Sequence, residues 1–432
     1  MKLKTLRNSI FFIALLFFVG GVGYRLGEKN FFSPAVEPSI IGAARTIVGQ
    51  DSPPDLRSVD FSEFWQVWQS LQDKYYDKSK LDPQKMVYGA IFGMVASLKD
   101  PWTQFLPPQD NQRAKEDLNG QFEGIGIQLG YKNDRLAVVA PLKGLPAEKQ
   151  GVKSGDLILH LKDEARGLDT DTNEMTIYEA VDNIRGEKGT AIELTLQHEG
   201  ADESYKVSIK RDTISVPSVE LSYGAVKDAK WIEEKDTVQG TKLTAVLKLN
   251  RFGDNTLSEW VTAVDALAER NKNDELTGMV LDLRNNPGGY LSGAVSLASE
   301  FIGKGVVVKQ QNGDGTVEEY NVNRRGQLYD IPLTVLVNKG SASASEILAG
   351  ALRAHKRAKI AGEKSFGKGT IQEALEFDNN TGLHVTTAKW LFPDGKWVND
   401  TEGIEPDIVV ENQAEDDTID LQLLKAAEEL VK

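Results

Sequence analysis

Residues 338–372 read NKGSASASEILAGALRAHKRAKIAGEKSFGKGTIQ, and this stretch decides the fold class and the chemistry. The run before it, Leu333–Val337 (LTVLV), is apolar and rich in β-branched residues, which is typical of a buried parallel strand. Glu346–Arg353 (EILAGALR) then predicts a helix. Ser343 therefore lies where a strand is followed by a helix. A nucleophile there has unpaired backbone N–H groups and the positive end of the helix dipole beside it, which a developing oxyanion needs.

A serine hydroxyl attacks a carbonyl carbon only when a nearby base takes its proton. The chain has four histidines: His160, His198, His355 and His384. Only His355 is near Ser343 in sequence, and an unbroken helix would place it about 18 Å along the axis, beyond hydrogen-bond reach. Lys368 is the better candidate, because burial can lower the pKa of a lysine from about 10.4 to roughly 7 or 8.

The segment around Lys368, Gly367–Gln372 (GKGTIQ), has the pattern of a strand. Side chains alternate along a strand, so Lys368, Thr370 and Gln372 would share one face. Gln372 could then orient the amine of Lys368.

Each of these residues also has a plainer interpretation. Ser343 and Glu346 form the Ser-x-x-Glu pattern of a helix cap, which is the usual meaning of such a pattern at a helix start. Ser341 and Ser345 compete with Ser343 for the role of nucleophile. A lone lysine is usually a solvated surface residue. The residue patterns alone do not show which of the three serines is the nucleophile.

The serine and lysine together give the chain a resemblance to the carboxy-terminal processing peptidases, also called tail-specific proteases. Lys368 follows Ser343 by 25 residues and Gln372 follows Lys368 by four, which are the family's spacings for nucleophile, base and orienting glutamine. Three further hallmarks of the family are Phe122–Gly130 (FEGIGIQLG), Leu281–Gly289 (LDLRNNPGG) and Lys389–Val410 (KWLFPDGKWVNDTEGIEPDIVV). The resemblance covers nearly everything after the N-terminal segment.

The resemblance implies a role for each matching residue. Ser343 would be the nucleophile, Lys368 the general base and Gln372 the residue that orients it. The backbone N–H groups of Gly288 and Ala344 would form the oxyanion hole. In isolation, the glycines of LDLRNNPGG could simply make a turn after a strand.

The predicted fold class is multi-domain α/β. Strand and helix patterns alternate in the region 213–412, at Ala245–Leu249, Leu257–Arg270, Thr277–Leu283 and Gly293–Phe301. The resemblance implies a crotonase/Clp-like α/β protease core with an inserted PDZ domain and a small N-terminal helical region. The predicted divisions are a signal anchor or signal peptide (1–28), a linker (29–57), the N-terminal helical region (58–115), the PDZ domain (116–212), the serine protease core (213–412) and a C-terminal helix (413–432).

The region 116–212 resembles a PDZ module. Gly124, Ile125, Gly126 and Ile127 stand where that module binds a terminal carboxylate. The glycines would let consecutive backbone N–H groups converge on the carboxylate, and the isoleucines would line a pocket for an apolar last side chain. The bound tail would add a strand to the sheet edge. The segment Lys162–Thr176 is longer and more acidic than in the family pattern.

The N-terminal helical region contains an aromatic stripe with Trp65, Trp68 and Tyr75. Such a stripe is more typical of a core than of a binding surface. Family members use this part to dimerise, so the resemblance also allows a homodimer.

The N-terminus predicts export. Lys2, Lys4 and Arg7 precede an apolar run, Ile10–Tyr24. Fifteen helical residues span about 22 Å against a hydrocarbon core of about 30 Å, so the run is short for an anchor. Gly21–Gly23 offers a small-residue cleavage site instead, although no Ala-x-Ala occurs there. We favour a membrane anchor, which the family commonly keeps, with the bulk of the chain outside the cytoplasm.

The composition limits the kinds of partner that the protein can bind. The 432 residues carry a net charge of −14, which argues against nucleic acid and against a basic contact with anionic lipid. The chain has no cysteine, which excludes disulfides, a cysteine nucleophile and thiolate metal sites. We expect neither a metal nor a cofactor.

The sequence thus predicts an extracytoplasmic serine endopeptidase that binds proteins with apolar C-terminal tails and cleaves near that end. Two other classes stay open. One is a tail-binding scaffold with an inactive hydrolase domain. The other is an acyl-transfer or lipid-binding protein on a crotonase-like fold, which would have little use for a PDZ module.

Overall fold

The computed structural model describes residues 59–411, apart from 133–134, 143, 174, 199 and 202, and residues 419–431. The predicted N-terminal anchor and the linker lie outside the described residues. Among the described helices, none has both the length and the apolar character that a membrane crossing needs. The chain divides into two compact units, one ending at Pro83 and the other beginning at Gln84.

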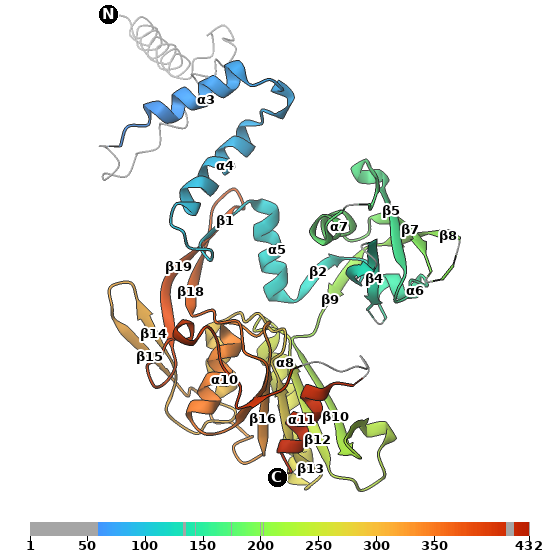
Figure 1. Cartoon of the computed structure of the whole chain (residues 1–432), viewed down its shortest axis with the longest axis vertical. Coiled ribbons are helices and arrows are strands. Elements are labelled where there is room, and N and C mark those ends of the chain that lie inside the picture. The colour runs from blue at the N-terminus through green and yellow to red at the C-terminus, as the bar shows by residue number, and fades with distance from the viewer. Residues whose placement is uncertain are drawn as a thin grey trace, which may run out of the picture. The chain divides into compact units, whose positions relative to one another are not determined.

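The described part of the first unit contains a long helix, α3 (Ser62–Lys74), and a short 3-10 turn, η2 (Lys78–Lys80) (Figure 1). No residue of α3 is buried. Its aromatic rings contact one another, with Trp65 and Trp68 centroids 6.3 Å apart, and Tyr75 is 43% exposed. The expectation that this stripe forms a core is therefore wrong within the described residues, where no side chain of α3 is buried. Dimerisation through this region stays a prediction.

The division falls at the first residue of α4 (Pro83–Ala96), and the second unit continues with a short strand β1 (Gln104–Leu106) and α5 (Pro108–Asn119). A left-handed glycine, Gly120 with φ of 66°, ends α5 and turns the chain into the next strand.

A β-rich module follows, entered and left through the antiparallel pair β2 (Gln121–Gly124) and β9 (Asp212–Ser215). Its main sheet has the order β3-β4-β5-β7-β8, with β6 pairing β5. The module has its own apolar core, centred on residues such as Ile125, Leu161 and Leu194. Its remaining elements are β3 (Ile127–Lys132), β4 (Arg135–Pro141), α6 (Pro146–Lys149), β5 (Leu157–Asp163), η3 (Glu164–Arg166), β6 (Leu168–Asp171), α7 (Ile177–Ile184), β7 (Ala191–Gln197) and β8 (Ser204–Lys210).

The largest part is a mixed α/β layer structure around a seven-stranded sheet of order β11-β10-β12-β13-β16-β17-β20. The pairs from β12 to β20 are parallel, as the β-branched run at Leu333–Val337 predicts. The strands are β10 (Val219–Lys227), β11 (Lys230–Glu233), β12 (Leu243–Leu249), β13 (Leu276–Asp282), β16 (Leu333–Val337), β17 (Lys359–Gly362) and β20 (Ile408–Val409).

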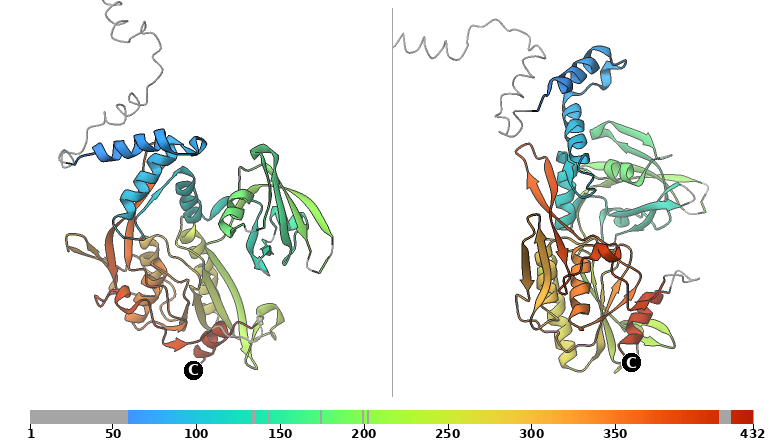
Figure 2. Two further views of the ribbon diagram at one scale, coloured as in Figure 1. Left: turned by 45° about the horizontal axis from the view of Figure 1, so that its top comes forward. Right: turned by 60° about the vertical axis from the view of Figure 1, so that its left-hand side comes forward.

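Helices cover both faces of this sheet. Three helices share one apolar cluster with alternate residues of the strands, such as Val335 and Val337 of β16: α8 (Thr256–Lys272), α9 (Leu291–Ala298) and α10 (Ala344–Ala354). Leu336 of β16 points to the other face, where it packs with α11 (Leu421–Glu429). The layers can be followed in Figure 2. The predicted C-terminal helix is thus present, over a shorter range.

A second sheet holds the segment that follows the predicted base. Its order is β1-β19-β14-β15, with β18 pairing β19. The strands are β14 (Val306–Asn312), β15 (Val317–Asn321), β18 (Thr370–Glu376) and β19 (Gly382–Leu391). β1 therefore brings residues near position 100 to the strands that follow Lys368.

Candidate active site

Ser343 has a strained backbone at the start of α10. Its φ of 54° and ψ of −115° lie in a region that only glycine adopts easily. Such strain costs of order 1–3 kcal/mol and persists where the surroundings fix the conformation, often at an active site. The side chain is only half-buried.

The neighbouring serines are fully buried and hydrogen-bonded. The hydroxyl of Ser341 donates to the Leu283 carbonyl at 2.8 Å, and that of Ser345 donates to the Asn286 carbonyl at 2.9 Å. Both hold the turn after β13 against the start of α10. Ser343 is the one serine of the three that is not fully buried and, within the described residues, the one whose hydroxyl does not donate to a backbone carbonyl, which favours it as the nucleophile.

Gly288 and Ala344 lie beside Ser343, as predicted. A Cβ on Gly288 would come within 2.8 Å of the Ser343 Cβ and 3.0 Å of the Ala344 nitrogen, so only glycine fits there. Ala344 is the first residue of α10, where the helix offers its N–H no carbonyl. The Gly288 N–H, however, donates to the Asn286 side-chain oxygen at 2.9 Å. It would have to leave Asn286 to bind an oxyanion.

Glu346 connects the serine to the lysine. One carboxylate oxygen accepts from the N–H of Ser343 at 2.8 Å and of Lys368 at 3.0 Å. The other accepts from the Ser365 hydroxyl at 2.6 Å and the Gly367 N–H at 2.7 Å. Burial raises the pKa of Glu346, against the lowering effect of these four donors. The predicted helix-capping glutamate is thus also the link between the two predicted catalytic segments.

Lys368 lies just before β18 rather than within it, so the prediction that it belongs to the strand is wrong. Its backbone is held by Glu346, and its ammonium lies over the Trp102 ring, 4.5 Å from the centroid. Burial lowers the pKa of Lys368, while the nearby negative charges of Asp100 and Glu346 oppose that lowering. Within the described residues no hydrogen bond joins its amine to Ser343.

Gln372 lies on β18, near a register shift between Ile371 and Gln372. Its side-chain amide donates to the hydroxyls of Thr370 at 2.9 Å and Thr386 at 3.1 Å. The shared face of Thr370 and Gln372 therefore agrees with the strand pattern. In the described structure these threonines fix Gln372, and no hydrogen bond reaches Lys368.

Within the described residues no hydrogen bond joins a histidine to Ser343, and His384 interacts electrostatically with Lys368. His355 ends α10 and its ring contacts the Val306 carbonyl at 2.7 Å. His384 on β19 is half-buried, and burial together with the positive charge of Lys368 lowers its pKa. His160 and His198 belong to the β-rich module, where they contact Asp169 and Asp156.

The turn after β13 is fixed to the C-terminal helix by an arginine. Arg284 contacts Asp282 at 2.6 Å and Asp420, just before α11, at 2.7 Å. Burial is the largest single effect on Asp420 and raises its pKa. The hydrogen bond and the positive charge of Arg284 act in the opposite direction, and the net result is a lowered pKa. These contacts hold the turn that leads to Gly288.

The predicted tail-binding residues form the connection between β2 and β3. Gly126 has a φ of 76°, and a Cβ there would meet Leu145 at 2.7 Å. Ile125 is buried in the module core, whereas Ile127 is half-buried beside it. The loop thus makes a left-handed turn at Gly126, and the tail-binding role of these residues stays a prediction.

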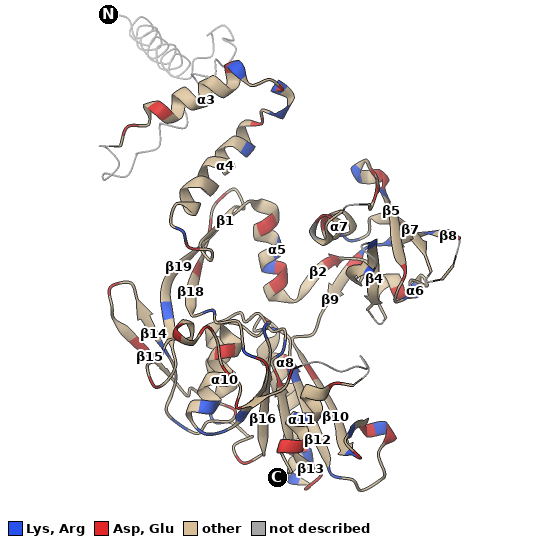
Figure 3. Ribbon diagram, in the orientation of Figure 1, with Lys and Arg blue, Asp and Glu red and all other residues tan. Residues whose placement is uncertain are grey.

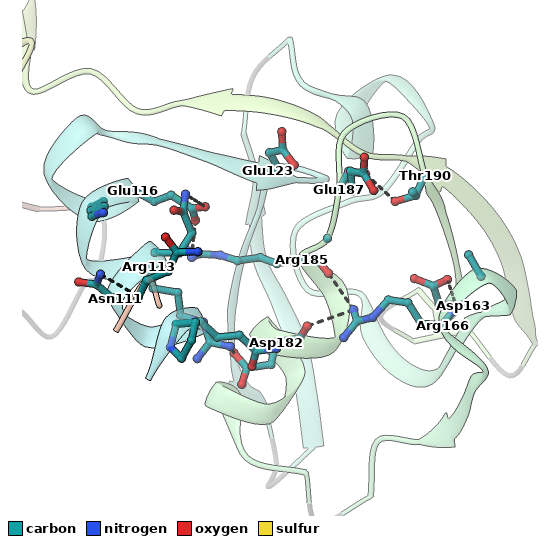
Figure 4. A pocket seen from close by; sticks show the side chains of 17 residues that line it. Asn111, Arg113, Glu116, Glu123, Asp163, Arg166, Asp182, Arg185, Glu187 and Thr190 are labelled. Atoms are coloured by element: carbon teal, nitrogen blue, oxygen red, sulfur yellow. Dashed lines mark hydrogen bonds and ion pairs between the residues drawn. The ribbon is translucent and has the colours of Figure 1, made fainter. Parts of the chain in front are cut away.

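A cavity of about 890 Å³ lies between α5 and the module (Figure 4). Its lining is charged, and two ion pairs cross it: Arg113 with Asp182 at 2.7 Å, and Arg185 with Glu116 at 3.8 Å. None of the predicted catalytic residues lines it. The cavity is bordered by polar contacts between α5 and the module. Its size alone does not make it the catalytic site.

Two residues of the site were missed in the sequence. Asp100 and Trp102 lie far from Ser343 in sequence and come to Lys368 because β1 pairs with β19. No local pattern marked them. In the described ranges no group of three or more His, Asp and Glu side chains is placed to hold a metal ion.

A strained serine at a helix start, beside a glycine turn on a parallel sheet, defines a serine hydrolase class of site. The model of peptidase family S41 matches residues 243–410. The carboxy-terminal processing protease CtpA of Bacillus subtilis (strain 168) is 35% identical over 369 residues, which are 85% of this chain and 72% of that protein. A probable CtpA-like serine protease of Staphylococcus epidermidis is 33% identical over 380 residues, 87% of this chain and 69% of that protein.

Solved structures agree. The photosystem II D1 C-terminal processing protease is 28% identical with a TM-score of 0.50, and the match covers 85% of this chain and 96% of that one. A putative S41 protease from Bacteroides fragilis, 15% identical with a TM-score of 0.52 over the same shares, supports the fold alone. The chain belongs to peptidase family S41 and is a serine-type carboxy-terminal processing protease.

Proposed function

We propose that this protease uses Ser343 as nucleophile and Lys368 as general base, and that the β-rich module is a PDZ domain that binds the C-terminal tail of its protein substrate. The observation that carries the catalytic assignment is Glu346, whose one carboxylate oxygen accepts from the backbone of both residues. Burying a carboxylate costs free energy unless hydrogen bonds satisfy it. The four donors of Glu346 satisfy it and at the same time fix the positions of the two segments that carry Ser343 and Lys368.

The proposed reaction passes through an acyl-enzyme. The Ser343 hydroxyl oxygen attacks the substrate carbonyl carbon as its proton passes to the Lys368 amine. The oxyanion binds the Ala344 N–H and the Gly288 N–H, once the latter has left Asn286. Lys368 then gives the proton to the leaving amine, and water hydrolyses the ester by the reverse sequence. Gln372, fixed by its threonines, would restrict where the amine moves.

The tail would bind along β3. Among the described strands β3 pairs with β4 alone and so forms an edge of the module sheet, with α7 packed beside it. An extended peptide can add to such an edge while its carboxylate meets backbone N–H groups of Gly124–Ile127. The chemistry recognises a free carboxylate and an apolar last residue.

We place the protease outside the cytoplasm, on the basis of the basic and apolar N-terminal segment. Figure 3 shows Lys and Arg interspersed with Asp and Glu along the described chain, a distribution that suits a soluble protein surface rather than a nucleic-acid groove.

Two observations favour a second candidate, a tail-binding protein whose hydrolase site is inactive. The Lys368 amine lies on Trp102, and the Gly288 N–H is bonded to Asn286. A fluorophosphonate probe, applied with and without a tail peptide, separates the candidates. Labelling of Ser343 in either condition supports the protease, and no labelling in both supports the binding protein.

Amidating the C-terminus of a model substrate should raise its KM, because an amide cannot accept the charge-assisted bonds of the proposed loop. The measurement compares kcat and KM for a free-acid and an amidated peptide of the same sequence. Equal cleavage of the two peptides would contradict tail recognition and leave the catalytic assignment intact. A short apolar peptide added in trans should stimulate cleavage of an unrelated peptide if the module is a switch, and only compete if it is a tether.

The rate should rise with pH through a group that titrates below the usual lysine pKa of 10.5, because burial lowers the pKa of Lys368 and only the neutral amine takes a proton. The measurement is kcat/KM against pH. EDTA should leave the rate unchanged. Loss of activity in EDTA that zinc restores would contradict the mechanism, and so would an inactive but stable His355→Gln variant.

A further inference from the structure

The loop from Asp100 to Thr103 covers the Lys368 amine. Trp102 places its ring 4.5 Å from the ammonium nitrogen, and Phe366 packs edge-on against that ring with centroids 5.8 Å apart. Asp100 folds the loop by accepting from the Trp102 N–H at 3.0 Å and the Thr103 hydroxyl at 2.6 Å. Thr103 in turn accepts from the Thr386 N–H at 3.0 Å, which fixes the loop to β19.

Two residues of this loop act on the amine in opposite directions. An indole beside an amine removes water from it, which favours the neutral form, although its face also attracts a cation. The Asp100 carboxylate favours the charged form. Burial is the larger influence on Lys368, and Asp100 is the larger of the two acidic influences.

We propose, on the basis of the proposed role of Lys368, that Trp102 and Asp100 are positioning residues for the base. Trp102 shields the amine from water and holds it while no substrate is bound, and Asp100 limits how readily the amine becomes neutral. When a substrate binds beside Ser343, the Lys368 amine would move away from the face of the Trp102 ring. The loop is then a part of the catalytic apparatus supplied by the segment before the β-rich module.

The other charged groups around the amine are also accounted for. Glu346 of α10 acts on it in the same direction as Asp100, but its carboxylate is committed to four donors. His384 of β19 senses the positive charge of Lys368, so a neutral lysine would make this histidine easier to protonate. A plainer interpretation is that Asp100 and Trp102 merely anchor β1. That interpretation predicts a change in stability without a change in how Lys368 titrates.

The test is the pKa of Lys368, measured by NMR on protein with 13C-labelled lysine side chains and assigned by the missing signal in Lys368→Met. Trp102→Ala should raise this pKa by about one unit, because restored hydration outweighs the lost attraction to the ring. Asp100→Asn keeps an oxygen for the Trp102 N–H and should lower the pKa by roughly half a unit. Trp231→Ala, on β11, removes the same side chain elsewhere and should leave it unchanged.

The same variants have a matching signature in activity. Trp102→Ala should lose about tenfold in kcat/KM at neutral pH and regain most of it at alkaline pH, whereas Trp102→Phe should stay close to the parent. Unchanged titration of Lys368 in a folded Trp102→Ala would overturn the proposal, and if Trp102→Ala does not fold, unchanged titration in Asp100→Asn would overturn it. Since the NMR measurement needs no turnover, it stands apart from the proposed function, which fails instead if Ser343→Ala remains active.

Discussion

Ser343→Ala and Lys368→Ala should each lower kcat/KM by roughly 10⁴-fold or more, because the nucleophile and its base act as one unit. Thermal unfolding should barely change, since the Ser343 side chain is half-buried and the Lys368 amine makes no hydrogen bond within the described residues. The measurement is hydrolysis of a free-acid peptide beside a melting curve for each variant.

Ser345→Ala is the matched control for the serine. It removes one buried hydrogen bond, to the Asn286 carbonyl, and should cost about 1 kcal/mol in the free energy of unfolding while most of the activity remains. Full loss of activity in Ser345→Ala with an active Ser343→Ala would contradict the assignment. The activity of Gln372→Ala should lie between that of Ser343→Ala and that of Ser345→Ala, because the glutamine orients the base and does not itself transfer the proton.

Glu346→Gln should lower kcat by about 100-fold while the protein still folds. A glutamine offers one acceptor oxygen where the carboxylate offers two, so one pair of donors faces an amide N–H₂ instead. Misplacing Ser343 relative to Lys368 by about 1 Å is enough for such a loss. The expected cost in the free energy of unfolding is about 1–3 kcal/mol.

The pH dependence of stability gives this variant a second measurement. Burial raises the pKa of Glu346 above 4.5, so the folded protein holds the proton more tightly than the unfolded chain. The stability from that proton is complete below pH 4.5 and is lost as pH rises through the folded pKa. Glu346→Gln should remove this component.

Glu300→Gln is the matched control for a buried glutamate. Glu300 is 1% exposed, pairs with Arg324 and accepts from the Gln327 N–H at 2.5 Å, away from Ser343. It should lose stability and keep kcat. If kcat fell as much in Glu300→Gln as in Glu346→Gln, the loss in Glu346→Gln could not be attributed to the broken connection between Ser343 and Lys368.

The sequence predicts the parallel sheet well because burial on both faces leaves a continuous apolar run. Leu333–Val337 is a strand over its full predicted length, and α10 begins one residue after Ser343. The turn from Leu281 to Gly289 could also be placed, since the carboxyl ends of neighbouring parallel strands β13 and β16 meet at one edge. Local patterns are sufficient for such elements.

What the sequence could not predict depends on contacts between distant segments. Trp102 lies at Lys368 only because β1 joins β19, a pairing that no local pattern specifies. Lys368 precedes its strand because its backbone N–H binds Glu346 rather than a strand partner. Local patterns likewise leave Ser341, Ser343 and Ser345 open; the family spacing points to Ser343, and the hydrogen bonds that occupy the other two hydroxyls favour the same choice.

The most direct test of the central claim is mass spectrometry of the trapped acyl-enzyme. The protein is mixed with a slowly hydrolysed ester or a fluorophosphonate, digested, and the modified residue is identified. We expect modification of Ser343 in the parent and at least 100-fold slower modification in Lys368→Ala. Modification of Ser341 or Ser345 instead, or equal rates in the parent and Lys368→Ala, would contradict the central claim.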